Sequence, residues 1–141
     1  MLQASTEKEK RLLFASIRLM ICVGHADGYM GEKEVNRIYQ LVEGKHFTLQ
    51  ERRILMSDLD DPKSPESIVR GMSMTPTEKL TILRQLYQIA LIDRKLSPAE
   101  EREIRRIACL LDIPEEKQRQ VEEWIYEGIS WRNRWEEIVG E

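Results

Sequence analysis

An acidic turn between two helical patterns occurs twice in the chain, and this repeat constrains the fold more than any other feature. The two copies are "HADGYMGEKE" (residues 25–34) and "LIDRKLSPAE" (residues 91–100). An offset of 66 residues aligns the charged positions of the two halves as well as the apolar ones, pairing Arg18 with Arg84, Asp27 with Asp93, and Glu34 with Glu100. Unrelated amphipathic helices would match only in their apolar positions. The repeat therefore predicts two related helical hairpins packed about a pseudo-twofold axis.

Helical spacing of apolar residues recurs along the whole chain, and no segment shows the strict alternation of a half-buried strand. We therefore predict one all-α domain of about seven helices over residues 1–141, a length that suits a single domain. Its predicted segments are a first hairpin at about 6–43, connecting helices at 44–74, a second hairpin at about 75–112, and C-terminal helices at 114–139.

Four pairs of residues have the spacing of a capping box. In this motif a hydroxyl and a carboxylate three residues later each accept a free backbone N–H at the start of a helix. The pairs predict helix starts at Thr6, Thr48, Thr75 and Ser97. Ser130 predicts a separate short turn of helix at the C-terminal end.

The charge balance excludes one class of partner. With 22 Lys+Arg against 25 Asp+Glu the formal net charge is -3, which gives no general attraction to nucleic acid, and no nucleic-acid partner is expected. The start of the chain lacks the order of a secretory signal, and no apolar run approaches the ~18 residues of a membrane span. We expect a cytoplasmic protein.

The sequence offers no sign of catalysis. No nucleophile stands in a recognisable arrangement with a base, so we expect no catalytic residues and no enzymatic activity. Cys22 and Cys109 lie within apolar helical patterns and are expected to be buried free thiols.

The segments "ADGYMGEKEVNRI" and "IDRKLSPAEEREIRRIACLLDI" resemble the two hairpins of the tellurite-resistance TerB-like family. In that family an Ala-Asp-Gly turn is followed by a glutamate seven residues after the aspartate, usually twice. The likeness covers about residues 10–127. It implies an all-helical, non-enzymatic protein linked to stress and tellurite resistance, with protein or membrane-associated partners and an acidic, metal-associated surface. The matching positions are Asp27, Glu34, Asp93 and Glu100. The chain departs from the pattern where Arg94 and Lys95 replace the expected glycine.

Two roles for these four carboxylates remain open. If the twofold axis brings both turns together, like charges converge, and two of them 4 Å apart repel by about 4 kcal/mol at an effective dielectric of 20. A set of oxygen ligands then favours Ca²⁺, Mg²⁺ or Mn²⁺. Alternatively, Glu34 and Glu100 cap helix N-termini, and Asp27 forms an ordinary turn with the glycine that follows it. The segment Asp58–Asp61 supplies either further acidic ligands or a plain turn.

The C-terminal end carries an aromatic face. Trp131, Trp135 and Ile138 share one side of the predicted helix. Such a face docks on its own domain, on another chain or on a membrane surface. We expect Trp124 to be buried, and we expect Trp131 and Trp135 to lie against the domain or against another chain.

Two functions follow from these features. The first is a non-enzymatic TerB-like interaction module, related to stress and tellurite resistance, with a divalent cation bound at the paired acidic turns. The second is a metal-free helical scaffold or adaptor for a protein or membrane-associated partner. A homo-oligomer is compatible with both.

Overall fold

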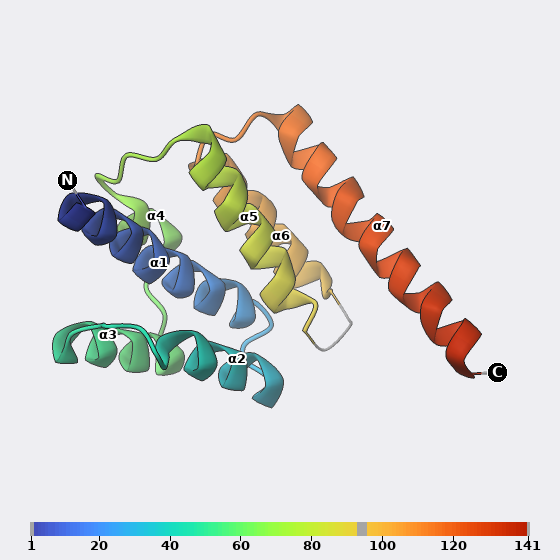
Figure 1. The fold of residues 1–141 in the computed structure, drawn as a ribbon, viewed down its shortest axis with the longest axis horizontal. Helices are drawn as coiled ribbons and strands as arrows, with labels where there is room; N and C mark the ends of the chain where they lie inside the picture. The colour runs from blue at the N-terminus through green and yellow to red at the C-terminus, as the bar shows by residue number, and fades with distance from the viewer. Residues whose placement is uncertain (1, 93–95, 141) are drawn as a thin grey trace.

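The computed structural model describes residues 2–92 and 96–140, and within them it contains seven α-helices and no strand. Figure 1 shows their arrangement. The helices are α1 (Leu2–Gly24), α2 (Glu32–Val42), α3 (Leu49–Asp60), α4 (Pro65–Val69), α5 (Pro76–Ala90), α6 (Pro98–Leu110) and α7 (Glu115–Gly140). The predicted all-α class is confirmed.

The inner helices of the two hairpins, α1 and α5, pack against each other in the middle of the bundle (Figure 1). Each inner helix also contacts the outer helix of the other hairpin, because α1 touches α6 and α5 touches α2. A pseudo-twofold relation between the hairpins would produce this reciprocal pattern. The connecting helices α3 and α4 both pack on α1.

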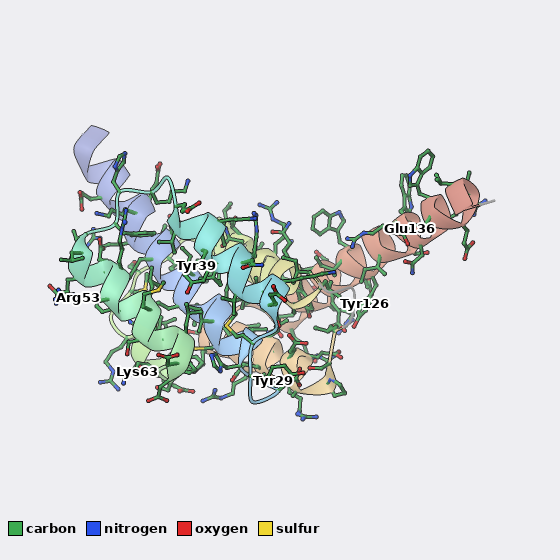
Figure 2. All side chains as sticks on the ribbon, turned by 90° about the horizontal axis from the view of Figure 1, so that it is seen from below. Tyr29, Tyr39, Arg53, Lys63, Tyr126 and Glu136 are labelled. Carbon is green, nitrogen blue, oxygen red and sulfur yellow. The ribbon has the colours of Figure 1, made fainter. Side chains whose placement is uncertain are left out.

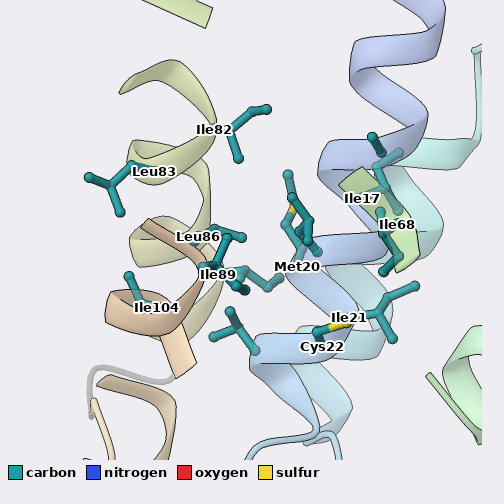
Figure 3. Close-up of a cluster of buried hydrophobic side chains, with 14 of the residues drawn as sticks. Ile17, Met20, Ile21, Cys22, Ile68, Ile82, Leu83, Leu86, Ile89 and Ile104 are labelled. Carbon is teal, nitrogen blue, oxygen red and sulfur yellow. The ribbon is translucent and has the colours of Figure 1, made fainter. Parts of the chain in front are cut away.

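The core lies where these helices meet. Figure 3 shows Met20, Leu86 and Ile89 between α1 and α5. Burial of a large apolar side chain typically stabilises a fold by about 1.5–3 kcal/mol, so these contacts hold the two hairpins together. The large side chains with almost no exposed surface include Ile17, Leu19, Ile21, Ile38, Leu55, Leu83, Leu86, Ile89, Ile104 and Ile107.

The predicted capping boxes are confirmed at three helix starts. The side chains of Thr48, Thr75 and Ser97 each accept a hydrogen bond from the backbone N–H of the glutamate three residues later. The side chain of that glutamate accepts the backbone N–H of the Thr or Ser. The prediction at Thr6 is wrong, because α1 already begins at Leu2 and no proline or glycine interrupts the segment between them. The prediction at Ser130 is also wrong. No proline follows Pro114, and α7 continues unbroken to Gly140.

The two cysteines differ in their surroundings, and both are free thiols. Cys22 is buried, as predicted, and burial raises the pKa of its thiol to about 12. Cys109 is exposed, so its predicted burial is wrong. The buried face of α6 carries Ile104, Ile107 and Ala108, and the helical turn places the next residue outside that face.

None of the helices in the described ranges combines the length and the apolar character that crossing a membrane requires.

Candidate functional site

The first acidic turn links α1 to α2. It contains Gly28, whose φ of +98° is a conformation that favours glycine. Glu34 lies in the first turn of α2, and its Oε1 atom accepts a hydrogen bond from the backbone N–H of Gly31 at 3.0 Å. His25 anchors the turn to α3, because its Nε2 atom lies 2.6 Å from the carbonyl oxygen of Leu59. Glu34 therefore caps a helix, as one of the two open interpretations predicts.

The second acidic turn has an equivalent cap at the start of α6. The Oε1 atom of Glu100 accepts a hydrogen bond from the backbone N–H of Ser97 at 3.1 Å. The Ser97 hydroxyl accepts the backbone N–H of Glu100 at the same distance. Ser97 aligns with Gly31 at the offset of the repeat, so the two glutamates hold equivalent positions in their helices.

The two acidic turns meet in the structure, which the repeat alone left open. The Ser97 hydroxyl donates a hydrogen bond to Oδ1 of Asp27 at 2.8 Å, which joins residues 70 positions apart. The side chains of Glu34 and Glu100 hydrogen-bond each other, and only 6% and 4% of these residues are exposed. Three of the four predicted residues thus come together. Asp93, the fourth, lies outside the described residues.

The Glu100 carboxyl group holds a proton more tightly than an exposed carboxyl group does. Burial raises the pKa of Glu100, and the nearby charge of Asp27 raises it further. The hydrogen bonds from Ser97 and the hydrogen bond with Glu34 offset part of this rise. Two carboxyl groups can hydrogen-bond directly only if one of them is protonated. Sharing a proton relieves the like-charge repulsion that would otherwise accompany their burial.

The exposed aromatic face of α7 is a second candidate site. Only the first half of α7 packs on the domain, where Val121 and Ile125 are partly buried against the core. Trp124, Trp131 and Trp135 are 56%, 82% and 64% exposed. Figure 2 shows the C-terminal end of α7 extending away from the other helices. The predicted burial of Trp124 is therefore wrong, and Trp131 and Trp135 do not dock on the domain.

Helix length explains these exposed tryptophans. With 26 residues, α7 is about 39 Å long, whereas the 15 residues of α5 reach only about 22 Å. Because α5 is the helix on which α7 packs, most of the second half of α7 extends past the helices that the structure describes. A groove of about 730 Å³ lies at the point of departure, and its lining includes Gln88, Leu91 and Ile92 near the end of α5 and Trp124, Gly128 and Trp131 on α7.

Comparison with known proteins identifies a family but no activity. The family described as "Protein of unknown function (DUF533)" matches residues 2–125. The chain belongs to this family. No curated protein and no solved structure matches the chain. Both acidic turns of this DUF533 member lie within the matched span, and most of the exposed half of α7 lies beyond it.

The divalent cation remains a prediction. Within residues 2–92 and 96–140, no three or more His, Cys, Asp and Glu side chains form a group able to hold a metal ion. One oxygen of Glu34 and one of Glu100 already accept backbone N–H groups. The hypothesis that Asp27, Glu34, Asp93 and Glu100 bind Ca²⁺, Mg²⁺ or Mn²⁺ is tested by melting the protein in chelator and in millimolar cation. A bound cation would raise the melting temperature by mass action.

Replacing Glu100 by glutamine is expected to stabilise the protein at pH 7. Because its pKa is raised in the folded state, Glu100 contributes stability that is full below the ordinary value of 4.5 and is lost as the pH rises through the raised value. Glutamine keeps the cap and offers Glu34 an N–H donor at every pH. We expect a gain of about 1 kcal/mol, or roughly 3–5 °C in Tm, and a weaker dependence of Tm on pH as the pH rises above 4.5.

Glu78→Gln is the matched control. Glu78 caps α5 from the same position, but there the Thr75 backbone N–H lowers the pKa of the carboxyl, so the charged form is favoured. The control substitution should lower Tm slightly at pH 7. A fall of similar size for Glu100→Gln would show that Glu100 acts as an ordinary charged cap.

Sequence analysis missed two residues that matter for these sites. Ser97 was expected only to cap α6. Its hydroxyl also donates a hydrogen bond to Asp27, because the two turns meet when the hairpins pack together. No role was predicted for Gly128. A glycine in the middle of a helix destabilises it by about 1 kcal/mol relative to alanine, which indicates that this position has a specific role.

Proposed function

We propose that the chain is a TerB-like interaction module without catalytic activity, which presents the exposed half of α7 to a protein partner. The observation that carries this proposal is the exposure of three tryptophans on one helix that extends beyond its own domain. Large aromatic side chains are enriched at the centres of protein interfaces because they bury much area in few contacts.

The TerB-like part of the proposal rests on the acidic turns. The paired Asp and Glu positions at an offset of 66 residues, and the contact between Glu34 and Glu100, are what two related hairpins of that family would bring together. A role in stress or tellurite resistance belongs to this part of the proposal. Membership of the DUF533 family does not itself support a role in stress or tellurite resistance, because the function of that family is unknown.

A protein partner suits the exposed half of α7 better than a membrane surface does. Arg132 and Arg134 are accompanied there by Glu127, Glu136 and Glu137, so this stretch has no excess of positive charge. Helices that lie on membranes are typically rich in lysine and arginine on their polar face, which anionic lipids attract. Mixed charge around an apolar face is the usual composition of a protein interface.

Photo-crosslinking in the cell tests the proposal directly. A photoreactive phenylalanine analogue is placed at Trp131 in the full chain, and in a second variant at Tyr39, an exposed aromatic residue on α2. We expect a discrete crosslinked species from position 131 and none from position 39. Absence of a discrete product at position 131, or equal diffuse products at both positions, would contradict a docking role for α7.

A further inference from the structure

Five exposed residues of α7 follow the seven-residue repeat of a coiled coil. Trp124, Gly128, Trp131, Trp135 and Ile138 are separated by alternate steps of four and three residues, which places them along one seam. We call these five residues the α7 seam. A seam of this kind is the surface through which one helix packs along another.

Gly128 is the small residue in a seam of large ones. A Cβ atom added there would meet nothing within 4 Å, and its backbone does not have a positive φ. Neither a close approach within the chain nor backbone geometry therefore requires glycine at this position. A glycine inside a helix that is not required by its own chain is explained if a bulky side chain of another chain approaches the backbone there.

The seam is self-complementary when two copies run antiparallel. If Trp131 of one copy lies opposite Gly128 of the other, then Trp124 lies opposite Trp135, because both pairs have their midpoint between Ile129 and Ser130. A parallel pair would set Gly128 against itself and each tryptophan against itself. A parallel pair would leave space between the two Gly128 residues and crowd the tryptophans, so its interface would be poorly packed.

Charges beside the seam match in the same register. Glu127 and Arg134 occupy equivalent flanking positions of consecutive heptads, and their midpoint lies within one residue of the midpoint that the seam pairs share. An antiparallel pair therefore places Glu127 of each copy beside Arg134 of the other, and such flanking charges set partner choice and orientation in coiled coils. The groove next to Gly128, lined in part by Leu91 and Ile92, lies where Trp131 of the second copy would enter.

We propose that a second copy of the chain covers the α7 seam as an antiparallel helix pair, with Trp131 of each copy seated against Gly128 and the neighbouring groove of the other. This inference rests on the proposed function, since it identifies the protein partner of that same face. The product is a twofold-symmetric dimer in which each domain lies beside the C-terminal half of the other copy's α7.

Charge reversal in the full chain tests the register. Sedimentation velocity over a concentration series gives the dimer dissociation constant of wild type, Glu127→Arg, Arg134→Glu and the double variant. Each single reversal creates two like-charge pairs, and we expect it to weaken the dimer at least about tenfold. The double variant restores both pairs and should return the dissociation constant to within about threefold of wild type. Glu123→Arg makes the same charge change at an exposed position off the seam and should change little.

A second variant tests whether Trp131 of one copy packs against Gly128 of the other. Gly128→Leu favours the helix but fills the space that Trp131 of the partner needs, so it should weaken the dimer at least about tenfold while Tm of the monomer rises or stays constant. A failure of the double charge variant to restore the dimer, or a dimer indifferent to Gly128→Leu, would overturn the proposed pairing.

The proposed dimer and the proposed function fail in different ways. If the purified chain is monomeric at all concentrations but position 131 crosslinks to a different protein in the cell, the dimer is excluded and the interaction module stands. If the chain is monomeric and position 131 gives no discrete product, both proposals fall.

Discussion

Replacement of Asp58 by asparagine is expected to destabilise the fold by about 3 kcal/mol, which corresponds to a fall of roughly 10 °C in Tm. Asp58 is 1% exposed and accepts hydrogen bonds from Nε and Nη2 of Arg18 at 2.6 and 3.3 Å. The Arg18 guanidinium also lies 5.7 Å from the centre of the Phe14 ring. Removing one charge of such a pair leaves the other poorly compensated inside the protein, which is costly. Urea unfolding should show a lower midpoint with an unchanged slope.

Asp60→Asn provides the matched control for this prediction. Asp60 lies two positions along the same helix and is exposed, so its replacement should change the free energy of unfolding by no more than about 0.5 kcal/mol. If Asp58→Asn behaved like Asp60→Asn, the ion pair between α1 and α3 would contribute little to the fold.

Asp58 also shows where sequence analysis reached its limit. Asp58–Asp61 was expected to supply either further acidic ligands or a plain turn. The turn is wrong for Asp58, which lies on the buried side of α3 one turn after Leu55. Helical spacing alone would have placed it in the core. Its partner, Arg18, belongs to another helix and lies 40 positions earlier. The spacing of residues within α3 does not predict that α3 packs against α1.

Local signals predicted the helices well because capping is a local interaction. The boxes at Thr48, Thr75 and Ser97 involve residues three positions apart, so the sequence contains both partners of each hydrogen bond. The internal repeat added long-range information. It predicted two related hairpins about a pseudo-twofold axis, and in the structure a hydrogen bond from Ser97 to Asp27 joins their acidic turns.

The environment of Glu34 and Glu100 and the exposure of α7 could not be predicted from the sequence. The raised pKa of Glu100 depends on burial by neighbouring helices, which spacing does not specify. The exposure of Trp131 depends on the lengths of α5 and α7 relative to each other. An aromatic face has the same spacing whether it docks on its own domain or extends past it.

Replacement of both Trp131 and Trp135 by serine is expected to abolish association without weakening the domain. Buried tryptophans at interfaces commonly contribute 2 kcal/mol or more each, so the two changes together should weaken binding by at least about 100-fold. Neither side chain packs in the core. We therefore expect Tm of the unassociated chain to change by no more than about 2 °C.

The docking role of α7 is tested most directly by native mass spectrometry of the tagged full chain isolated under mild conditions from cells, as wild type and as the Trp131→Ser, Trp135→Ser double variant. The predicted result is a discrete assembly heavier than one chain for wild type and the mass of a single chain for the double variant, with Tm of the domain preserved. Wild type at the mass of a single chain, or a double variant that retains the assembly, would contradict the proposed interaction module.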